Sequence, residues 1–367
     1  MKYFDLQAIN QSFEPELSDA VRQVLRSGWY LHGEATARFE EQFARYCRAP
    51  HCIGTGNGLD ALTLIFLAYR ELGQMQAGDE VIVPANTYIA TILAVMRAGL
   101  KPVLCEPLAE TCNLSPVEAE KLITPRTRAL LPVHLYGLPA DSPSFARLAR
   151  RYQLKVIEDA AQAHGALSDG HPAADATAYS FYPAKNLGAL GDGGAVVTHD
   201  SELAAVVRSL SNYGSTEKYT FLYKGVNSRL DEVQAAALSV KLKRLDADNA
   251  RRREIAQRYR AEIHWQAGGL STTLLHRPMD ERNVYHIFPL FSPQRDALQH
   301  HLAAHHIETL IHYPIPPHRQ QALQQEYVHL HLPVTEKLSS EELSLPISPL
   351  LSEKEVTHVI DCVNGFV

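Results

Sequence analysis

The sequence predicts an α/β fold with a large, mixed but mostly parallel sheet flanked by helices, and a smaller C-terminal α+β domain. Short apolar runs alternate with helical segments between residues 51 and 198, and this alternation is typical of a parallel sheet covered by helices on both faces. A long segment rich in helix formers follows, after which extended segments return. We therefore expect a large domain over residues 1–245, with an N-terminal helical segment, and a smaller domain over residues 246–367.

The predicted elements follow one another in a regular order. Apolar side chains recur every three or four positions in residues 13–48, which indicates helices. The strand candidates after them are HCIG, DEVIVP, KPVLCEP, RALLPVH, KVIE, ATAYSFYP and GGAVVTH, with helical segments between most of them. Residues 231–259 predict one long helical region, and NVYHIFPLF and IHYPIPP predict strands or extended segments of the second domain.

Composition excludes several classes of function. The formal net charge of −6 gives no basic surface for nucleic acid, so we expect no nucleic-acid partner. No stretch approaches the roughly 20 apolar residues of a membrane span, and the N-terminus lacks the apolar core of a signal peptide. Five cysteines without CxxC pairing indicate reduced thiols and a cytoplasmic protein. The histidine-rich HHLAAHHIETLIHYP is interpreted as a solvated helix, and we expect no metal.

Three short stretches could take part in chemistry, and each also has a purely structural explanation. Asp159 follows a short apolar strand, but aspartate is equally typical of a helix N-cap. The glycines of GTGNG precede a helix whose free N–H groups would bind an anion such as phosphate, although a tight turn explains them too. Lys185 lies between an aromatic pair and a glycine-rich turn. A lysine amine of depressed pKa reacts with carbonyls, although an ordinary loop lysine also fits.

Together these stretches match the needs of one cofactor. Pyridoxal 5′-phosphate (PLP) requires an amine to hold its aldehyde, a carboxylate against its pyridinium nitrogen and an anion cradle for its phosphate. An aromatic ring against the cofactor face also helps, and Tyr88 in PANTYIAT can supply it. The combination favours a PLP site over three unrelated structural features.

Segments spread over nearly the whole chain form a more specific pattern. They are SGWYLHGEATARFEEQFARY, GTGNGLDAL, VIVPANTYIAT, VHLYGLPAD, VIEDAAQAHGA, SFYPAKNLGALGDGGAVVT, SNYGS, GVNSRLDEVQAAAL, HYPIPPH and SLPISPLLSEKEV. With these segments the chain resembles the DegT/DnrJ/StrS family of sugar aminotransferases, which are fold-type I PLP enzymes. The resemblance implies that PLP is the cofactor, with its pyridoxamine phosphate (PMP) form in the half-reaction.

The resemblance also implies roles for residues around the cofactor ring. Lys185 would hold PLP covalently and, once released, would move a proton between the α-carbon of the amino donor and the C4′ atom of the cofactor. Asp159 would keep the ring nitrogen protonated, Gln162 would touch the side of the ring hydroxyl, and Tyr88 would stack on the ring. One type of member has histidine in place of the lysine and dehydrates sugars, and Lys185 argues against that chemistry here.

The phosphate of the cofactor would be held by two parts of the chain. The resemblance implies that the backbone at Gly58 and Leu59 binds it together with Ser180. Asn227 in GVNSRLDE would reach the phosphate of the neighbouring subunit's cofactor. This last role implies a homodimer with shared active sites.

Members of the family aminate keto-sugars linked to a nucleotide, with glutamate as the usual donor. The segments VPANTYIATILAV, SNYGSTEKYTFLYKGVNSRLDE and HYPIPPH most resemble the 3-aminotransferases that act on dTDP-3-keto-6-deoxyhexoses. The alternatives are a 4-aminotransferase on a dTDP-, GDP- or UDP-4-keto sugar, and a non-catalytic regulatory protein of the same fold.

Six residues are candidates for binding the sugar or its diphosphate. They are Tyr182, Lys218, Tyr219, Arg229, His312 and Tyr313. Structural alternatives stay open for them: Arg229 could pair with an acidic residue at the start of the next helix, His312 could cap a strand, and Tyr182 could belong to the core.

Overall fold

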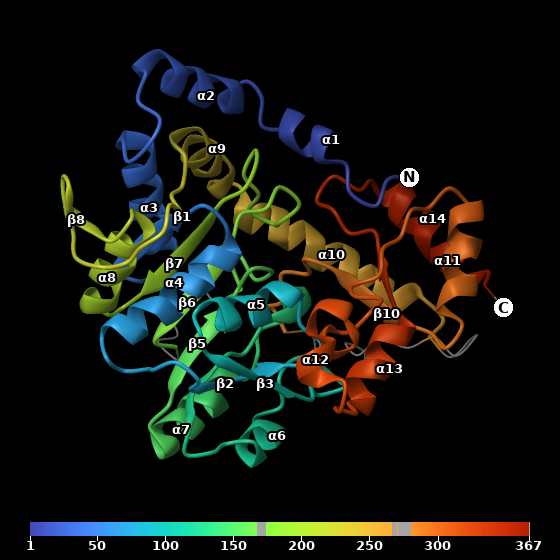
Figure 1. Cartoon of the computed structure of the whole chain (residues 1–367). Helices are drawn as coiled ribbons and strands as arrows, with labels where there is room; N and C mark the ends of the chain where they lie inside the picture. Colours follow the sequence, from blue (N-terminus) through green and yellow to red (C-terminus); the bar gives the residue numbers. More distant parts are fainter. Residues whose placement is uncertain (167–173, 266–269, 271–279, 367) are drawn as a thin grey trace.

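The computed structural model describes residues 1–166, 174–265, 270 and 280–366. It confirms the predicted fold class, because its centre is a seven-stranded sheet in the order β1-β7-β6-β5-β4-β2-β3 (Figure 1). The strands are β1 (His51–Thr55), β2 (Glu80–Pro84), β3 (Lys101–Cys105), β4 (Thr127–Leu130), β5 (Lys155–Asp159), β6 (Ala176–Ser180) and β7 (Gly194–Thr198). Only β7 runs antiparallel to its neighbours within this sheet, so the sheet is mixed and mostly parallel.

Alternate residues of each strand face opposite sides of the sheet, and both sides are buried. In β2, Val81 and Val83 join one apolar cluster, whereas Ile82 between them joins another. In β7, Val196 and Val197 divide in the same way. This is the period of two that a strand imposes on its side chains, and it explains why these strands are apolar throughout.

Helices cover both faces. Side chains of α4 (Gly58–Glu71), α5 (Ile89–Arg97) and α8 (Ser201–Ser211) pack with Val81 and Val196 on one face. The opposite face is covered by α3 (Glu34–Tyr46), α6 (Pro116–Lys121), α7 (Ser142–Tyr152) and α9 (Glu232–Leu242). The sheet therefore forms the middle of three layers.

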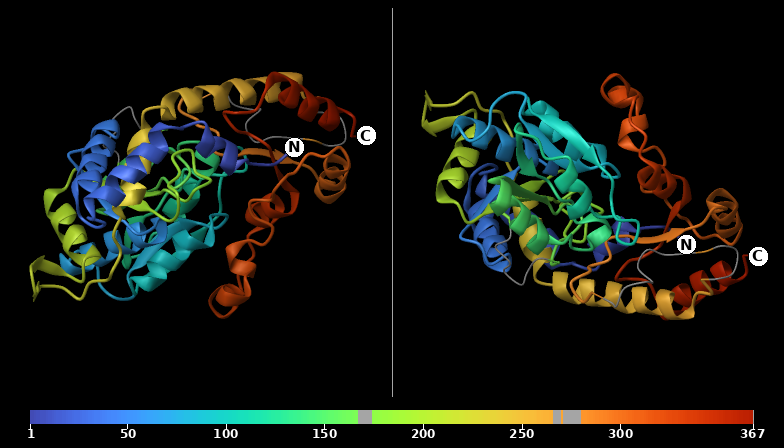
Figure 2. Two further views of the ribbon diagram at one scale, coloured as in Figure 1. Left: turned by 90° about the horizontal axis from the view of Figure 1, so that it is seen from above. Right: turned by 90° about the horizontal axis from the view of Figure 1, so that it is seen from below.

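A second unit forms around its own core. It is built from α10 (Leu245–Glu262), β10 (Phe288–Phe291), α11 (Arg295–Ala304), β11 (Glu342–Leu345) and α14 (Glu353–Asn364). Between α11 and β11 the chain forms α12 (Gln324–Tyr327), whose Tyr327 joins the core of the large unit, and α13 (Pro333–Glu341). Strands β10 and β11 pair antiparallel, and a separate apolar cluster joins them to α10, α11 and α14. Figure 2 shows α10 running along one side of the molecule from the large unit to this smaller one. The domain boundary expected after residue 245 stays a prediction; α10 begins at Leu245.

The N-terminal segment touches both units. Helices α1 (Leu6–Gln11) and α2 (Glu16–Ser27) run along the edge of the molecule (Figure 1). The first residues pair with the C-terminal unit, where the Tyr3 N–H donates to Glu308 (3.0 Å) and the Glu308 N–H donates to the Met1 carbonyl (3.1 Å). Short elements complete the described chain: η1 (Leu135–Gly137), η4 (Pro317–Arg319), η5 (Gln321–Leu323) and the hairpin of β8 (Ser215–Glu217) with β9 (Thr220–Phe221).

Two predicted segments differ in detail from the structure. The long helical region expected over residues 231–259 is helical, but it consists of two helices, which break at Lys243 and Arg244 so that α9 covers the sheet while α10 leaves it. Of the two forms expected for IHYPIPP, a strand or an extended segment, the strand is wrong, because its three prolines lack the N–H groups that a ladder needs and only Leu310 before it bridges to Ser344.

Candidate active site

The predicted functional residues gather at one edge of the central sheet. Strands β1, β2, β5 and β6 are oriented alike, so their carboxyl ends meet at this edge. Asp159 is the last residue of β5, and Ser180 is the last residue of β6. Ligands of open α/β sheets bind at this position, outside the carboxyl ends of the strands.

The Asp159 carboxylate is held in a fixed orientation. Its Oδ2 atom accepts a hydrogen bond from the Thr91 hydroxyl (2.8 Å), and its Oδ1 atom accepts one from the Ala161 N–H (3.0 Å). Turns rather than a helix follow in residues 160–166. The helix N-cap alternative is therefore wrong, and the carboxylate is a buried group at a strand end.

Lys185 lies in a tight loop after β6. Its N–H donates to the Tyr182 carbonyl (2.8 Å), and a Cβ on Gly188 would lie 2.1 Å from the Pro183 carbonyl oxygen, so only glycine permits this turn. Burial lowers the pKa of the Lys185 amine to about 8, and the nearby negative charge of Asp159 opposes that shift. An amine with this pKa can exchange protons near neutral pH.

The start of α4 offers donors for an anion. Asn57 caps this helix, because its side-chain oxygen accepts from the Asp60 N–H (2.8 Å) and its carbonyl accepts from the Ala61 N–H (3.1 Å). The N–H groups of Gly58 and Leu59 have no acceptor within the helix, as the first turn of any helix dictates. A Cβ on Gly58 would lie 2.6 Å from the Ser180 Cβ, so the backbone there comes as close to Ser180 as a glycine allows.

Two tyrosines and an amide lie close to these groups. The rings of Tyr88 and Tyr313 have centroids 5.2 Å apart, and the Tyr88 ring is exposed. The Gln162 side-chain N–H donates to the Tyr313 hydroxyl (3.1 Å), while its oxygen accepts from the Tyr136 N–H (2.6 Å). Gln162 therefore ties Tyr313, which comes from the C-terminal unit, to the edge of the large sheet.

His312 precedes Tyr313, and the positive charge of Lys185 affects its pKa. Burial, with the nearby positive charge of Lys185, lowers the pKa of His312 to about 4, so the ring is neutral at pH 7. Its Nδ1 atom lies 2.8 Å from the Ser344 hydroxyl, and its backbone N–H donates to the Glu342 carboxyl group (2.5 Å). The sequence also allows His312 to be a strand cap. Its ring instead contacts the Ser344 hydroxyl, so strand capping does not describe its role.

The other candidate residues lie on the surface of this single chain. Tyr182 is 56% exposed, so it does not belong to the core. Lys218 and Tyr219 lie on the exposed hairpin of β8 and β9, where the Lys218 amine sits 5.3 Å from the Tyr219 ring centroid. Asn227 is exposed as well. Arg229 donates to the Asn212 side chain (3.0 Å) rather than to the acidic residues that follow it.

Three residues of the site were not predicted from the sequence. Thr91 binds Asp159, and it could have been found because it follows Tyr88 by one helical turn on the same face of α5. Glu342 and Ser344 hold His312 from β11, but about 30 residues separate them from it and no local pattern marks them.

The residues at this edge fit PLP. They provide one lysine amine of lowered pKa, a fixed carboxylate close enough to influence it, and a helix start with two free N–H groups next to a serine hydroxyl. An exposed tyrosine ring lies nearby. Which of these residues holds which part of the cofactor stays a prediction.

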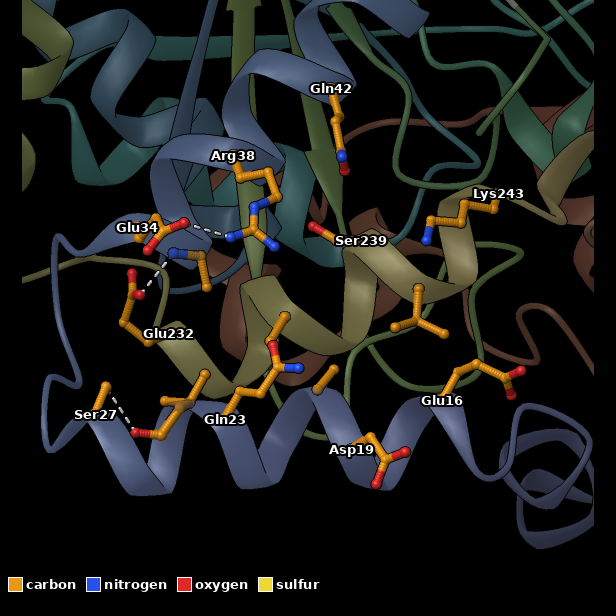
Figure 3. Close-up of a pocket in the computed structure, with 15 residues that line it drawn as sticks. Glu16, Asp19, Gln23, Ser27, Glu34, Arg38, Gln42, Glu232, Ser239 and Lys243 are labelled. Atoms are coloured by element: carbon orange, nitrogen blue, oxygen red, sulfur yellow. Dashed lines mark hydrogen bonds and ion pairs between the residues drawn. The ribbon is translucent and has the colours of Figure 1, made fainter.

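A separate cavity of about 400 Å³ lies between α2, α3 and α9 (Figure 3). The Glu232 carboxylate at its wall accepts hydrogen bonds from the N–H groups of Gly33, Ala35 and Thr36, so it caps α3. Arg38 pairs with Glu34 (2.6 Å) within the same helix. The charged groups of this cavity thus serve local structure, and none of the predicted site residues lines it.

The described part of the chain contains neither a membrane-spanning helix nor a cluster of metal ligands. None of its helices is long and apolar enough to cross a membrane. In residues 1–166, 174–265, 270 and 280–366, no three His, Cys, Asp or Glu side chains are grouped so that they could hold a metal ion.

A mixed α/β sheet that presents a lysine amine and a fixed carboxylate at one edge, beside an anion-binding helix start, defines an enzyme of the PLP-dependent class. The chain belongs to the DegT/DnrJ/EryC1/StrS aminotransferase family, whose model matches residues 11–364. The predicted family, fold class and aminotransferase activity are confirmed.

Curated relatives match over their full length. A "dTDP-3-amino-3,6-dideoxy-alpha-D-galactopyranose transaminase" from Aneurinibacillus thermoaerophilus is 50% identical and covers 99% of both chains. An "Erythromycin biosynthesis sensory transduction protein EryC1" from Saccharopolyspora erythraea is 49% identical over 98% of this chain and 97% of its own. The two names differ in kind, since one describes a transaminase and the other a sensory protein.

Solved structures agree with the fold. DesV of S. venezuelae, crystallised "in complex with ketimine intermediate", superposes with a TM-score of 0.92 at 45% identity, covering 99% of this chain and 97% of that one. NtdA of Bacillus subtilis, solved "with bound cofactor pmp", gives a TM-score of 0.91 at 32% identity, covering 99% and 84%.

Proposed function

We propose that this chain is a PLP-dependent aminotransferase that converts a dTDP-3-keto-6-deoxyhexose into the corresponding 3-amino sugar, with glutamate as the amino donor. Such a reaction belongs to the biosynthesis of deoxyaminosugars for surface polysaccharides or antibiotics. The observation that carries the proposal is the 50% identity over both full lengths to a dTDP-3-amino sugar transaminase, in a chain that places Lys185 and Asp159 together.

The cofactor supplies an electron sink that stabilises negative charge at the carbon next to the reacting nitrogen. Asp159 would orient it and favour a proton on its ring nitrogen, since a carboxylate fixed by Thr91 and Ala161 cannot turn away. The Lys185 amine, once free, would take the proton from the α-carbon of glutamate. Gly58, Leu59 and Ser180 would bind the phosphate, and Tyr88 would cover one face of the ring.

His312 and Tyr313 are the best-supported contacts for the sugar, because His312 lies within reach of the Lys185 charge and Tyr313 contacts the Tyr88 ring. Both come from the other unit of the fold. Tyr182 lies next to the same loop and is free to meet a ligand. Lys218, Tyr219 and Arg229 would meet the diphosphate, whose charge suits basic groups.

We further propose a homodimer with shared active sites. Exposed apolar side chains gather on the segment of residues 29–31 and on the segment of residues 213–226, which includes the exposed hairpin. Trp29 is 63% exposed and Tyr219 is 83% exposed, which is unusual for such large rings on a lone protein. A second copy of the chain would cover them, and Asn227 next to this surface would then reach the partner's cofactor.

The proposed site of the reaction is the cytoplasm. All five cysteines are free thiols, which suits a reducing compartment.

A spectroscopic experiment tests the activity. Purified protein with PLP should absorb above roughly 400 nm, as a protonated Schiff base does, and glutamate should bleach this band. Adding a dTDP-3-keto-6-deoxyhexose should restore the band and release a product whose amino group NMR places at C3. Amination at C4 would reject the proposed regiochemistry, and a Lys185→Ala protein that keeps the band would reject the assigned lysine.

The same experiment addresses the sensory protein among the relatives. A regulatory role without turnover requires no amino transfer, so repeated bleaching and recovery with glutamate and keto sugar would exclude it. A protein that binds PLP but never bleaches would support it.

A further inference from the structure

The buried Glu342 carboxyl group contacts His312 in two ways, directly at the backbone N–H and through the Ser344 hydroxyl at the ring. Glu342 and Ser344 are neighbouring inward-facing residues of β11, and both are almost fully buried. One carboxyl oxygen of Glu342 accepts from the His312 backbone N–H (2.5 Å), and the other lies 2.5 Å from the Ser344 hydroxyl. The same hydroxyl lies 2.8 Å from His312 Nδ1. Ser344 thus stands between the carboxyl group and the imidazole ring.

The Tyr3 hydroxyl also forms a hydrogen bond with Ser344. With Tyr3 as the donor of that bond, two hydrogen arrangements satisfy this chain of contacts. If Glu342 is ionised, Ser344 donates to it, and the Ser344 oxygen accepts from His312 Nδ1–H, so the Nε2 atom has no proton. If Glu342 is protonated, it donates to Ser344, which donates to Nδ1, and Nε2 carries the proton. A neutral imidazole has only these two tautomers, and the low pKa of His312 keeps it neutral.

Within the described part of the chain, His312 Nε2 makes no hydrogen bond, and the ring is only partly buried. This nitrogen is therefore the one that a ligand in the site can reach. A ketone or diphosphate oxygen can only accept a hydrogen bond, so it would bind the Nε2–H tautomer and not the other.

We propose that Glu342 and Ser344 are positioning residues that set the tautomer of His312, so that protonated Glu342 makes His312 Nε2–H a donor to an acceptor oxygen of the substrate. In the deprotonated state the Glu342 proton has passed to Ser344 and the Ser344 proton to Nδ1, while Nε2 has released its own proton to solvent and faces that oxygen as an acceptor. One proton leaves the network in total, and no bond to carbon changes in this step.

The surroundings of Glu342 favour its protonated form at neutral pH. Burial raises the pKa of Glu342 to about 8, and Arg295 of α11 is the charged group that opposes this shift. The hydroxyl groups of Tyr3, Tyr136 and Tyr313 face it from the N-terminal segment, η1 and the loop after His312, and burial raises the pKa of each above its usual value. These phenols therefore stay neutral near pH 8. The His312 tautomer should change around pH 8, because Glu342 loses its proton there.

Glu342→Gln tests the switch directly. The glutamine amide donates to Ser344 and accepts from the His312 N–H, as the protonated acid does, so this variant should hold the Nε2–H tautomer at every pH. Ser344→Ala is the matched control, because it removes the connection and leaves the carboxyl group in place.

The first measurement is the tautomer of His312 in the PLP-bound protein, by ¹⁵N NMR with histidine labelling and assignment through His312→Gln. The wild-type tautomer should change around pH 8, Glu342→Gln should not change, and Ser344→Ala should lose the change. A wild-type tautomer that is constant from about pH 6.5 to about pH 9.5, or a Ser344→Ala protein that follows the wild type, would overturn the proposal.

The second measurement concerns the substrate and rests on the proposed function. The KM for the keto sugar should rise about threefold to tenfold above pH 8 in the wild type, which is the value of one hydrogen bond, and should stay low in Glu342→Gln. An NMR switch with an identical KM profile in both proteins would overturn the role of Nε2 toward the substrate. Failure of the transamination itself would leave the NMR result valid, so the two failures are distinct.

Discussion

Asp159 ends strand β5, and Lys185 lies in the loop that follows the neighbouring strand β6. The charge of the carboxylate affects the pKa of the amine. Burial alone would favour a neutral amine, whereas the carboxylate favours the charged one, and the balance leaves the pKa of the free amine at about 8. Asp159 cannot relax toward Lys185, because Thr91 and Ala161 occupy its two oxygens. The Asp159 carboxylate therefore keeps its position beside the Lys185 amine.

This pKa predicts how the chemical step depends on pH. Below about pH 8 the Lys185 amine is protonated and cannot accept the α-proton of glutamate, so the single-turnover rate with saturating glutamate should rise with pH through about 8 and then level off. Stopped-flow bleaching of the cofactor band measures it. Lys185→Arg should be inactive at every pH, and a wild-type rate that does not change across this range would contradict the assignment.

Thr91 is predicted to act through Asp159. Thr91→Val removes the hydroxyl that donates to Oδ2 and leaves a buried carboxylate with one donor fewer, so the affinity for PLP should fall about tenfold. Thr91→Ser keeps the hydroxyl and should restore most of it. Titration of the apoprotein with PLP, followed by absorbance, gives both dissociation constants; equal values for Thr91→Val and the wild type would show that the bond does not position Asp159.

At the scale of elements, the first turn of α4 packs directly against the end of β6. Gly58 lies so close to Ser180 that a methyl group there would overlap the serine Cβ at 2.6 Å. The phosphate site proposed here depends on that approach, since the free N–H groups and the hydroxyl must surround the same anion.

Gly58→Ala should therefore weaken PLP binding about tenfold or more, because the added methyl group pushes α4 away from β6. The double variant Gly58→Ala with Ser180→Gly removes the overlapping Cβ and should recover part of the packing, and Ser180→Gly alone reports the loss of the hydroxyl. Pyridoxal, which lacks the phosphate, should bind equally to the wild type and to Gly58→Ala; a loss for both ligands would indicate general damage to the fold.

Elements that depend on local pattern were predicted well from the sequence. The seven strands were found because each is a short apolar run between turns. Asp159 and Lys185 were singled out as candidates because each follows such a run. The break between α9 and α10 was missed, because strong helix formers continue through Lys243 and Arg244 and only packing on the sheet ends α9 there.

The contacts of His312 could not be predicted from the sequence, because its partners lie far along the chain. His312 depends on Glu342 and Ser344, which reach it only because β11 pairs with β10 and returns to Leu310. A polar residue in a short apolar strand gives no sign of its partner. The role of the buried Glu342 carboxyl group therefore follows only from its three-dimensional contacts.

At the scale of the whole molecule, the single chain leaves part of its proposed site exposed. The hairpin that begins with β8 projects from the large unit (Figure 1). It carries Lys218 and Tyr219, and Asn227 is exposed as well. If two copies associate through the apolar segments at residues 29–31 and 213–226, each copy would supply these groups to the other. Light scattering of the purified protein should then give twice the mass of one chain.

Dimers that contain two different variants can distinguish an active site shared between two chains from one formed within a single chain. Lys185→Ala and Asn227→Ala should each be nearly inactive alone, because every site in either homodimer lacks one group. When the two proteins are unfolded and refolded together, half of the dimers are mixed, and each mixed dimer has one site with both Lys185 and the partner's Asn227 intact. Activity should therefore recover to about a quarter of the wild-type value if the site is shared across a twofold interface. If Asn227 acts within its own chain, every site in the mixed dimer lacks either the lysine or the asparagine, and the refolded mixture should be no more active than its components.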